Sequence, residues 1–323
     1  MLLARNPHNA QRSNEKQVGQ YPVAKSPHPI ELKPDVFRDD ESLNEVKTPL
    51  PRPNMASTVP QVVLFGDSLF QQCSDIQDGF SFQAALQSDF IRRLDIVNRG
   101  YSGFNTDIAL RYLPEIFPER TASSPKMDYL VLLFGANDAV LPGAITKQHV
   151  PINRYKENLT KIINHPRIAA HKPHILLVTP PPLDEIKTTP RSIENGHQGA
   201  VRKSAISAAY SEVAREVARE NPGVILVDLW KAQMDKAISL TPDDYTPGGP
   251  WLGDPENGKQ GGLDTLLHDG LHMSGSGYRV FYESLKPFIG KEWHGLTDDD
   301  RKGFVIPDWR ELLELKPNLN TGD

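Results

Sequence analysis

Five short apolar runs, separated by segments with helical patterns, constrain the fold of this chain more than any other feature. The runs are VVLF, LDIVN, YLVLLF, HILLVT and VILVDL, at residues 62–65, 94–98, 129–134, 174–179 and 224–229. Apolar runs of this length are typical of strands that are buried on both faces. Such strands, joined by crossover helices, form parallel sheets covered by helices on both sides. The sequence therefore predicts an α/β fold, a three-layer α/β/α sandwich around a central parallel sheet of about five strands.

The connecting segments predict helices at residues 82–94, 106–116, 154–163, 201–220 and 276–285. Along the fourth of these, apolar side chains recur at four-residue spacing opposite charged residues, and we expect them to face the core. They are Val201, Ala205, Ala209, Val213 and Val217.

The chain divides into a domain at residues 59–293 and two flanking segments. Residues 1–58 mix charges of both signs with many prolines, which predicts a disordered extension. Met55 lies directly before the first strand, and one hypothesis is that translation begins there. Residues 294–323 form a tail in which VIPDWRELLELKP predicts a short helix that docks on the domain or meets a partner.

Residues 239–262 are too rich in Gly, Pro and Asp for an ordinary connection. Long loops without secondary structure are usually lids or disordered insertions. Because this loop runs directly into a histidine-containing segment, we expect it near the active site, with Tyr245 and Trp251 contacting substrate. Surface disorder stays open as the alternative.

Charge and cysteine content exclude several classes of protein. The net charge is −5 over 323 residues, and without a run of Lys and Arg we expect no nucleic-acid partner. Cys73 is the only cysteine, so an intramolecular disulfide is ruled out. No apolar stretch spans a bilayer and the first residues lack the apolar part of a secretory signal, so we expect no integral membrane segment and a cytoplasmic location. Basic residues near the start leave a transit peptide as a weaker alternative, and homo-oligomerisation stays open.

Ser68 follows the first strand directly, in FGDS. In open parallel sheets the ligand crevice lies outside the carboxyl ends of the strands. A helix that begins there favours developing negative charge at its N-terminus. Asp and Ser are also ordinary helix caps, so this tripeptide alone does not identify a nucleophile. For Asp67 we prefer a bond to the backbone of its own turn over a role in orienting the site.

Two further strand ends carry hydrogen-bond donors. NRGYSGFNT, after the second strand, has Gly100 and Gly103, where a backbone N–H can face a ligand. FGANDA, after the third strand, has Asn137, whose amide can hold an oxyanion. Turn and cap roles remain the alternatives for both segments.

The segment HDGLHMSGSGY supplies a candidate base. Asp269 and His272 are three residues apart, so in a turn the carboxylate can orient the imidazole that removes the Ser68 proton. His268 and His272 would suit a metal site only on a helix, and Gly270 argues against one. We therefore expect no metal, with a cap for the following helix as a further alternative.

FGDSL, GYSG, GAND and DGLH stand in the order of the four blocks of the SGNH hydrolases, also called GDSL-type esterases and lipases. The resemblance covers residues 59–293, and the residues in and around these motifs are most similar to those of the isoamyl acetate-hydrolysing esterase group. It implies the flavodoxin-like SGNH-hydrolase fold and a serine carboxylic ester hydrolase that acts on small-molecule, acetate-like esters without a cofactor.

The resemblance also implies roles for the residues of the four blocks. Ser68 would be the nucleophile, and its own N–H would form the oxyanion hole with the Gly103 N–H and the Asn137 side chain. Gly100 is the fallback for Gly103. Asp269 and His272 would complete the triad.

Other functions remain as alternatives. A carbohydrate deacetylase or an acyltransferase of the same fold would use the same residues. A non-catalytic binding module would not need all of them. A dinucleotide-binding enzyme is disfavoured because no G-x-G-x-x-G follows the first strand.

Overall fold

The computed structural model describes residues 59–297 and 300–313. The expected disordered extension and Met55 lie outside the described residues.

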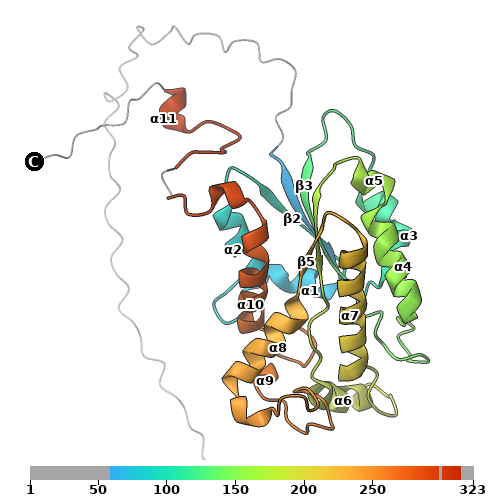
Figure 1. Ribbon diagram of the computed structural model, residues 1–323. Coiled ribbons are helices and arrows are strands. Elements are labelled where there is room, and N and C mark those ends of the chain that lie inside the picture. Colours follow the sequence, from blue (N-terminus) through green and yellow to red (C-terminus); the bar gives the residue numbers. More distant parts are fainter. Residues whose placement is uncertain (1–58, 298–299, 314–323) are drawn as a thin grey trace, which may run out of the picture. The chain divides into compact units, whose positions relative to one another are not determined.

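Five parallel strands form one sheet, as expected from the apolar runs (Figure 1). The strands are β1 (Gln61–Gly66), β2 (Asp95–Gly100), β3 (Met127–Leu133), β4 (His174–Val178) and β5 (Val224–Val227). Their order is β2-β1-β3-β4-β5, and all neighbours run parallel. The chain moves from β1 to one side and returns past it to β3, so the strand order reverses between these two strands. Ligands bind at such reversal points, outside the carboxyl ends of the strands.

Helices cover both faces of the sheet (Figure 1). One face packs against α2 (Phe82–Asp89), α8 (Leu229–Leu240) and α10 (Gly275–Leu285), and the other against α3 (Thr106–Ile116), α4 (Ile152–Ile163) and α7 (Ser204–Glu220). β1 shows why two cores form: Val62 and Leu64 join the first, whereas Val63 and Phe65 join the second. The remaining α-helices are α1 (Ser68–Gln71), α5 (Pro166–Ala169), α6 (Glu185–Glu194), α9 (Leu263–Leu266) and α11 (Trp309–Leu312). Within the described ranges, every helix is too short or too polar to cross a membrane.

The predicted stripe on α7 is only partly correct, because Val217 is buried and Val213 packs against the core but the other three residues do not lie on the buried face. Ala205 and Ala209 are exposed, and Val201 precedes the helix. A four-residue step overshoots one helical turn by about 40°, so residues spaced in this way drift around the helix. The buried face contains Tyr210 and Ala214 together with Val217.

The end of a predicted helix and the end of a predicted strand also differ from the prediction. α2 ends at Asp89 rather than at residue 94, and a turn leads from it into β2. The run at residues 224–229 is a strand only to Val227, because Asp228 caps α8 by accepting a hydrogen bond from the Lys231 N–H at 3.1 Å.

The C-terminal tail docks on the domain. Arg93 donates to the carbonyl oxygens of Asp300 at 2.7 Å and Lys302 at 2.9 Å. Arg92 donates to the carbonyl oxygen of Pro307 at 2.7 Å, just before α11. A short helix, α11, lies within the stretch where one is expected, and the residues before it contact the domain.

Candidate active site

Ser68 lies where β1 ends and α1 begins. Asp67 is fully buried, and its Oδ1 accepts a hydrogen bond from the Leu69 N–H at 2.9 Å. This is the structural role that we preferred for Asp67. The Tyr278 hydroxyl of α10 donates to the Leu69 carbonyl at 2.7 Å and so ties this turn to the helical layer. Ser68 retains 7% exposure and lines a pocket at the carboxyl end of the sheet.

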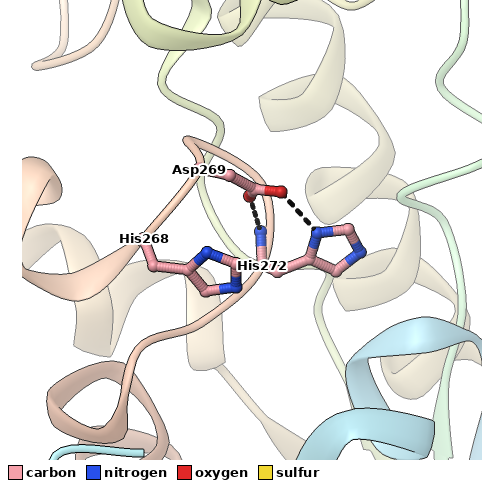
Figure 2. Close-up of side chains that lie close together, drawn as sticks. All are labelled: His268, Asp269 and His272. Atoms are coloured by element: carbon pink, nitrogen blue, oxygen red, sulfur yellow. Dashed lines mark hydrogen bonds and ion pairs between the residues drawn. The ribbon is translucent and has the colours of Figure 1, made fainter.

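The loop between α9 and α10 brings Asp269 and His272 to Ser68. The His268 N–H donates to the His272 carbonyl at 3.0 Å and closes a tight turn. In this turn Asp269 Oδ1 accepts from the N–H groups of Leu271 at 3.0 Å and His272 at 2.8 Å. Figure 2 shows the other carboxylate oxygen facing the imidazole, and Oδ2 lies 2.9 Å from His272 Nδ1. On the far side of the ring, His272 Nε2 lies 2.9 Å from Ser68 Oγ.

The electrostatics of this turn keep Asp269 ionised. Burial raises the pKa of Asp269, but the hydrogen bonds from His272 outweigh it and hold the pKa well below its usual range. Arg191 of α6 adds a cation 3.1 Å from Oδ2. An ionised carboxylate here stabilises an imidazolium, which a general base becomes when it takes a proton.

The metal-site alternative competes with this arrangement. Potential ligand atoms of His268, Asp269 and His272 lie within 4.8 Å of one another, on a turn rather than a helix. Both ring nitrogens of His272 already contact a partner, Asp269 on one side and Ser68 on the other. A metal on His272 would have to displace one of them, so the geometry favours the triad.

Gly100 allows β2 to pack closely against the backbone of α1. Its N–H donates to Asn98 Oδ1 at 2.8 Å, and a Cβ at this position would overlap the backbone of α1 at Gln71. Its N–H is therefore not available to a substrate, which removes the fallback choice for the oxyanion hole.

Gly103 lies in the pocket with a φ of +81°, a conformation that favours glycine. Gln148 Nε2 donates to the Gly103 carbonyl at 2.9 Å and holds this peptide in place. In the part of the chain that the structure describes, the N–H groups of Gly103 and Ser68 have no hydrogen-bond partner. Both are available to a ligand in the pocket.

Asn137 follows β3 and is 5% exposed. Its Nδ2 donates to the Phe104 carbonyl at 2.9 Å, and its Oδ1 accepts from Arg202 Nη2 at 3.1 Å. One amide hydrogen therefore remains for a ligand. The structure thus brings all five expected site residues, Ser68, Gly103, Asn137, Asp269 and His272, to one pocket.

Most of the remaining pocket lining was not identified from the sequence. The pocket has a volume of about 280 Å³, and α6 and the segment after it form much of its wall. These residues are Thr188, Arg191, Ser192, Asn195, His197, Val201 and Arg202. The start of α6 could have been recognised in the sequence, because Asp is a common N-cap residue. Asp184 caps α6 by accepting a hydrogen bond from the Lys187 N–H at 3.0 Å.

The expectation that residues 239–262 line the pocket mouth is wrong. None of the pocket-lining residues found in the described part of the chain comes from this loop. Trp251 instead stacks on Tyr245, with ring centroids 5.2 Å apart. The loop instead binds the start of α6. Gln260 donates to the capping Asp184 at 2.7 Å, and the Gly253 carbonyl accepts from the Glu185 N–H at 3.0 Å.

Comparisons with known proteins identify the family of this chain. The profile of the GDSL-like Lipase/Acylhydrolase family matches residues 64–280. The isoamyl acetate-hydrolyzing esterase 1 homolog of Rattus norvegicus is 31% identical over 268 residues, which cover 81% of this chain and 91% of that protein. A GDSL esterase/lipase of Arabidopsis thaliana is 31% identical over 243 residues, covering 74% and 89%.

Solved structures with a similar chain trace include a lipase/acylhydrolase from Enterococcus faecalis, with a TM-score of 0.46 and 24% identity. It is matched over 70% of this chain and 92% of its own. The acetyl xylan esterase AlAXEase has a TM-score of 0.49 at 18% identity, over 71% and 99%.

Proposed function

The chain belongs to the GDSL-like lipase/acylhydrolase family and is a carboxylic ester hydrolase, and from this premise we propose that it hydrolyses small acyl esters through an acyl-enzyme on Ser68. The observation that carries the proposal is the unbroken chain of contacts from Asp269 through His272 to Ser68, with 2.9 Å at each link.

In the first half-reaction His272 Nε2 takes the Ser68 proton while Oγ attacks the ester carbonyl. The carbonyl oxygen becomes an oxyanion, for which the N–H groups of Ser68 and Gly103 and the Asn137 amide are the donors. When the intermediate collapses, His272 returns the proton to the departing alcohol and the acyl group stays on Oγ. Water, activated by the same histidine, then releases the acid and restores Ser68.

The pocket supports a short acyl group. Its volume of about 280 Å³ is close to the lower end of the range for ligand pockets, and its lining includes the aliphatic side chains of Val201 and Leu271. A long acyl chain would extend beyond this pocket and leave part of its apolar surface against water. Isoamyl acetate, the ester for which the rat relative is named, is therefore the first substrate to test.

The test combines active-site labelling with turnover. A fluorophosphonate probe should label Ser68, and acetate esters should be hydrolysed faster than octanoate esters. Ser68→Ala should abolish both readouts. A protein that is neither labelled nor active would favour a binding module.

Asn137→Ala tests the oxyanion hole separately. Loss of one oxyanion donor typically lowers kcat by about 100-fold or more, so this variant should fold normally and turn over at about 1% or less of the wild-type rate. Wild-type turnover would rule out the assigned hole.

A second candidate is the deacetylation of a carbohydrate. The α6 wall presents Thr188, Ser192 and Asn195, which are suited to hydrogen bonds with a polyhydroxyl alcohol. A kcat/KM for an acetylated oligosaccharide well above that for isoamyl acetate would favour this candidate. Transfer of the acyl group to an added alcohol, detected as a new ester, would instead favour an acyltransferase.

A further inference from the structure

Arg202 lies in the pocket wall, two residues before α7, and makes two directed hydrogen bonds to the segment that follows β3. Its Nε donates to the Ala136 carbonyl at 3.1 Å, and its Nη2 donates to Asn137 Oδ1 at 3.1 Å. A planar guanidinium held at two points cannot rotate freely, so it presents a donor to Asn137 in a fixed direction.

An asparagine amide has two orientations of similar shape, in which oxygen and nitrogen exchange places. For Asn137 the surroundings select one of them. Arg202 offers only donors and therefore requires the amide oxygen on its side. The Phe104 carbonyl offers only an acceptor and requires the amide nitrogen at 2.9 Å on the other side. A flipped amide would set donor against donor and acceptor against acceptor.

We propose that Arg202 is a positioning residue that locks the Asn137 side chain with its N–H facing the oxyanion. This inference rests on the proposed function, because it matters only if Asn137 is an oxyanion donor. Without Arg202 the amide oxygen loses its donor and only the bond to the Phe104 carbonyl holds the side chain, so the amide is less firmly oriented toward the reacting carbonyl. A donor that is already oriented stabilises the oxyanion without reorganising during the reaction.

Arg202 is also near other charges of the site. Burial lowers its pKa, while the nearby carboxylates of Asp67 and Asp269 raise it. Its positive charge therefore offers a second explanation for any loss of activity, a direct effect on the oxyanion or on the triad. The experiment has to separate orientation of Asn137 from charge.

A double-mutant cycle makes this separation. Arg202→Met and Asn137→Ala are made singly and together, and kcat and KM for p-nitrophenyl acetate are measured per fluorophosphonate-labelled site, well below each variant's Tm. Arg202→Met alone should lower kcat by about tenfold or more, but not by more than Asn137→Ala does. Its KM should change by less than about threefold. In the Asn137→Ala background the same substitution should change kcat by less than about twofold.

Two further variants serve as controls. Arg191→Met removes the other arginine of the pocket, which contacts Asp269 and not Asn137, so its effect on kcat should be the same in both Asn137 backgrounds. Arg202→Lys keeps the charge but loses the two-point geometry, and it should recover only part of the lost kcat.

Equal effects of Arg202→Met in both backgrounds, or full recovery with lysine, would overturn the inference and identify a direct charge effect. A loss of Tm with unchanged kcat would also overturn it, because Arg202 would then act only on stability. Full activity of Asn137→Ala would refute the proposed oxyanion hole itself, which is a different outcome.

Discussion

Asp269→Asn is expected to disable His272 through its tautomer. Oδ1 of Asp269 accepts two backbone N–H groups, from Leu271 and His272, so an asparagine here must keep its oxygen in that position. Its NH₂ group then replaces Oδ2 and points at His272 Nδ1, 2.9 Å away. A donor facing Nδ1 forces the ring proton onto Nε2, the nitrogen that faces Ser68. In this tautomer the imidazole cannot accept the Ser68 proton.

The expected loss in kcat is about 10⁴-fold near neutral pH, or about 5 kcal/mol in the barrier, as is typical when a triad histidine is held in the wrong tautomer. The assay is p-nitrophenyl acetate hydrolysis, with circular dichroism to verify folding. Asp264→Asn is the matched control, because it removes a carboxylate that binds Lys187 at 2.7 Å and not His272. If folded Asp269→Asn kept more than a tenth of wild-type activity, the assignment of Asp269 as the residue that sets the His272 tautomer would be wrong.

Two further predictions concern a backbone donor and a buried acid. Gly103→Ala forces an alanine to a φ of +81° and should shift the backbone N–H at this position, which lowers kcat by about tenfold or more. The control is Gly143→Ala, at a φ of +82° with open space around it. It should lose a similar amount of stability and keep the wild-type kcat. Equal kcat for the two variants would exclude the Gly103 N–H as a donor. Burial raises the pKa of Asp138 to about 7, so the folded state binds this proton more tightly than the unfolded chain does. The free energy of unfolding should therefore fall as the pH is raised from about 4 to about 7. Asp138→Asn should flatten the fall of Tm over this range, measured by thermal melts, and an unchanged pH dependence would contradict the buried ionisation.

The parts of the site that local sequence identifies are those built by a strand end or a tight turn. Ser68 and Asn137 each follow a buried apolar strand within four residues, and parallel strands bring such positions to one edge of a sheet. Asp269 and His272 need only their own turn to meet. For these residues the local sequence pattern is therefore enough to predict where the side chain lies in the fold.

Other features depend on tertiary packing that no local pattern encodes. Arg202 reaches Asn137 across 65 residues of chain, and its own neighbourhood contains no motif. Residues 239–262 run directly into the His272 segment, yet the loop folds behind α6 because Gln260 and the Gly253 carbonyl bind the start of that helix. Closeness in sequence to a catalytic candidate therefore did not predict closeness in space.

The contact between Ser68 and His272 joins residues that are 204 positions apart. At ribosomal rates of about 5–20 residues per second, the serine is made roughly 10–40 s before the histidine. During that interval the β1 turn can form, but the serine beside it has no base and remains an ordinary alcohol. On the proposed mechanism, a polypeptide whose synthesis stops before residue 272 would contain Ser68 but lack its base, so Ser68 would become reactive only after the loop that carries His272 has been translated.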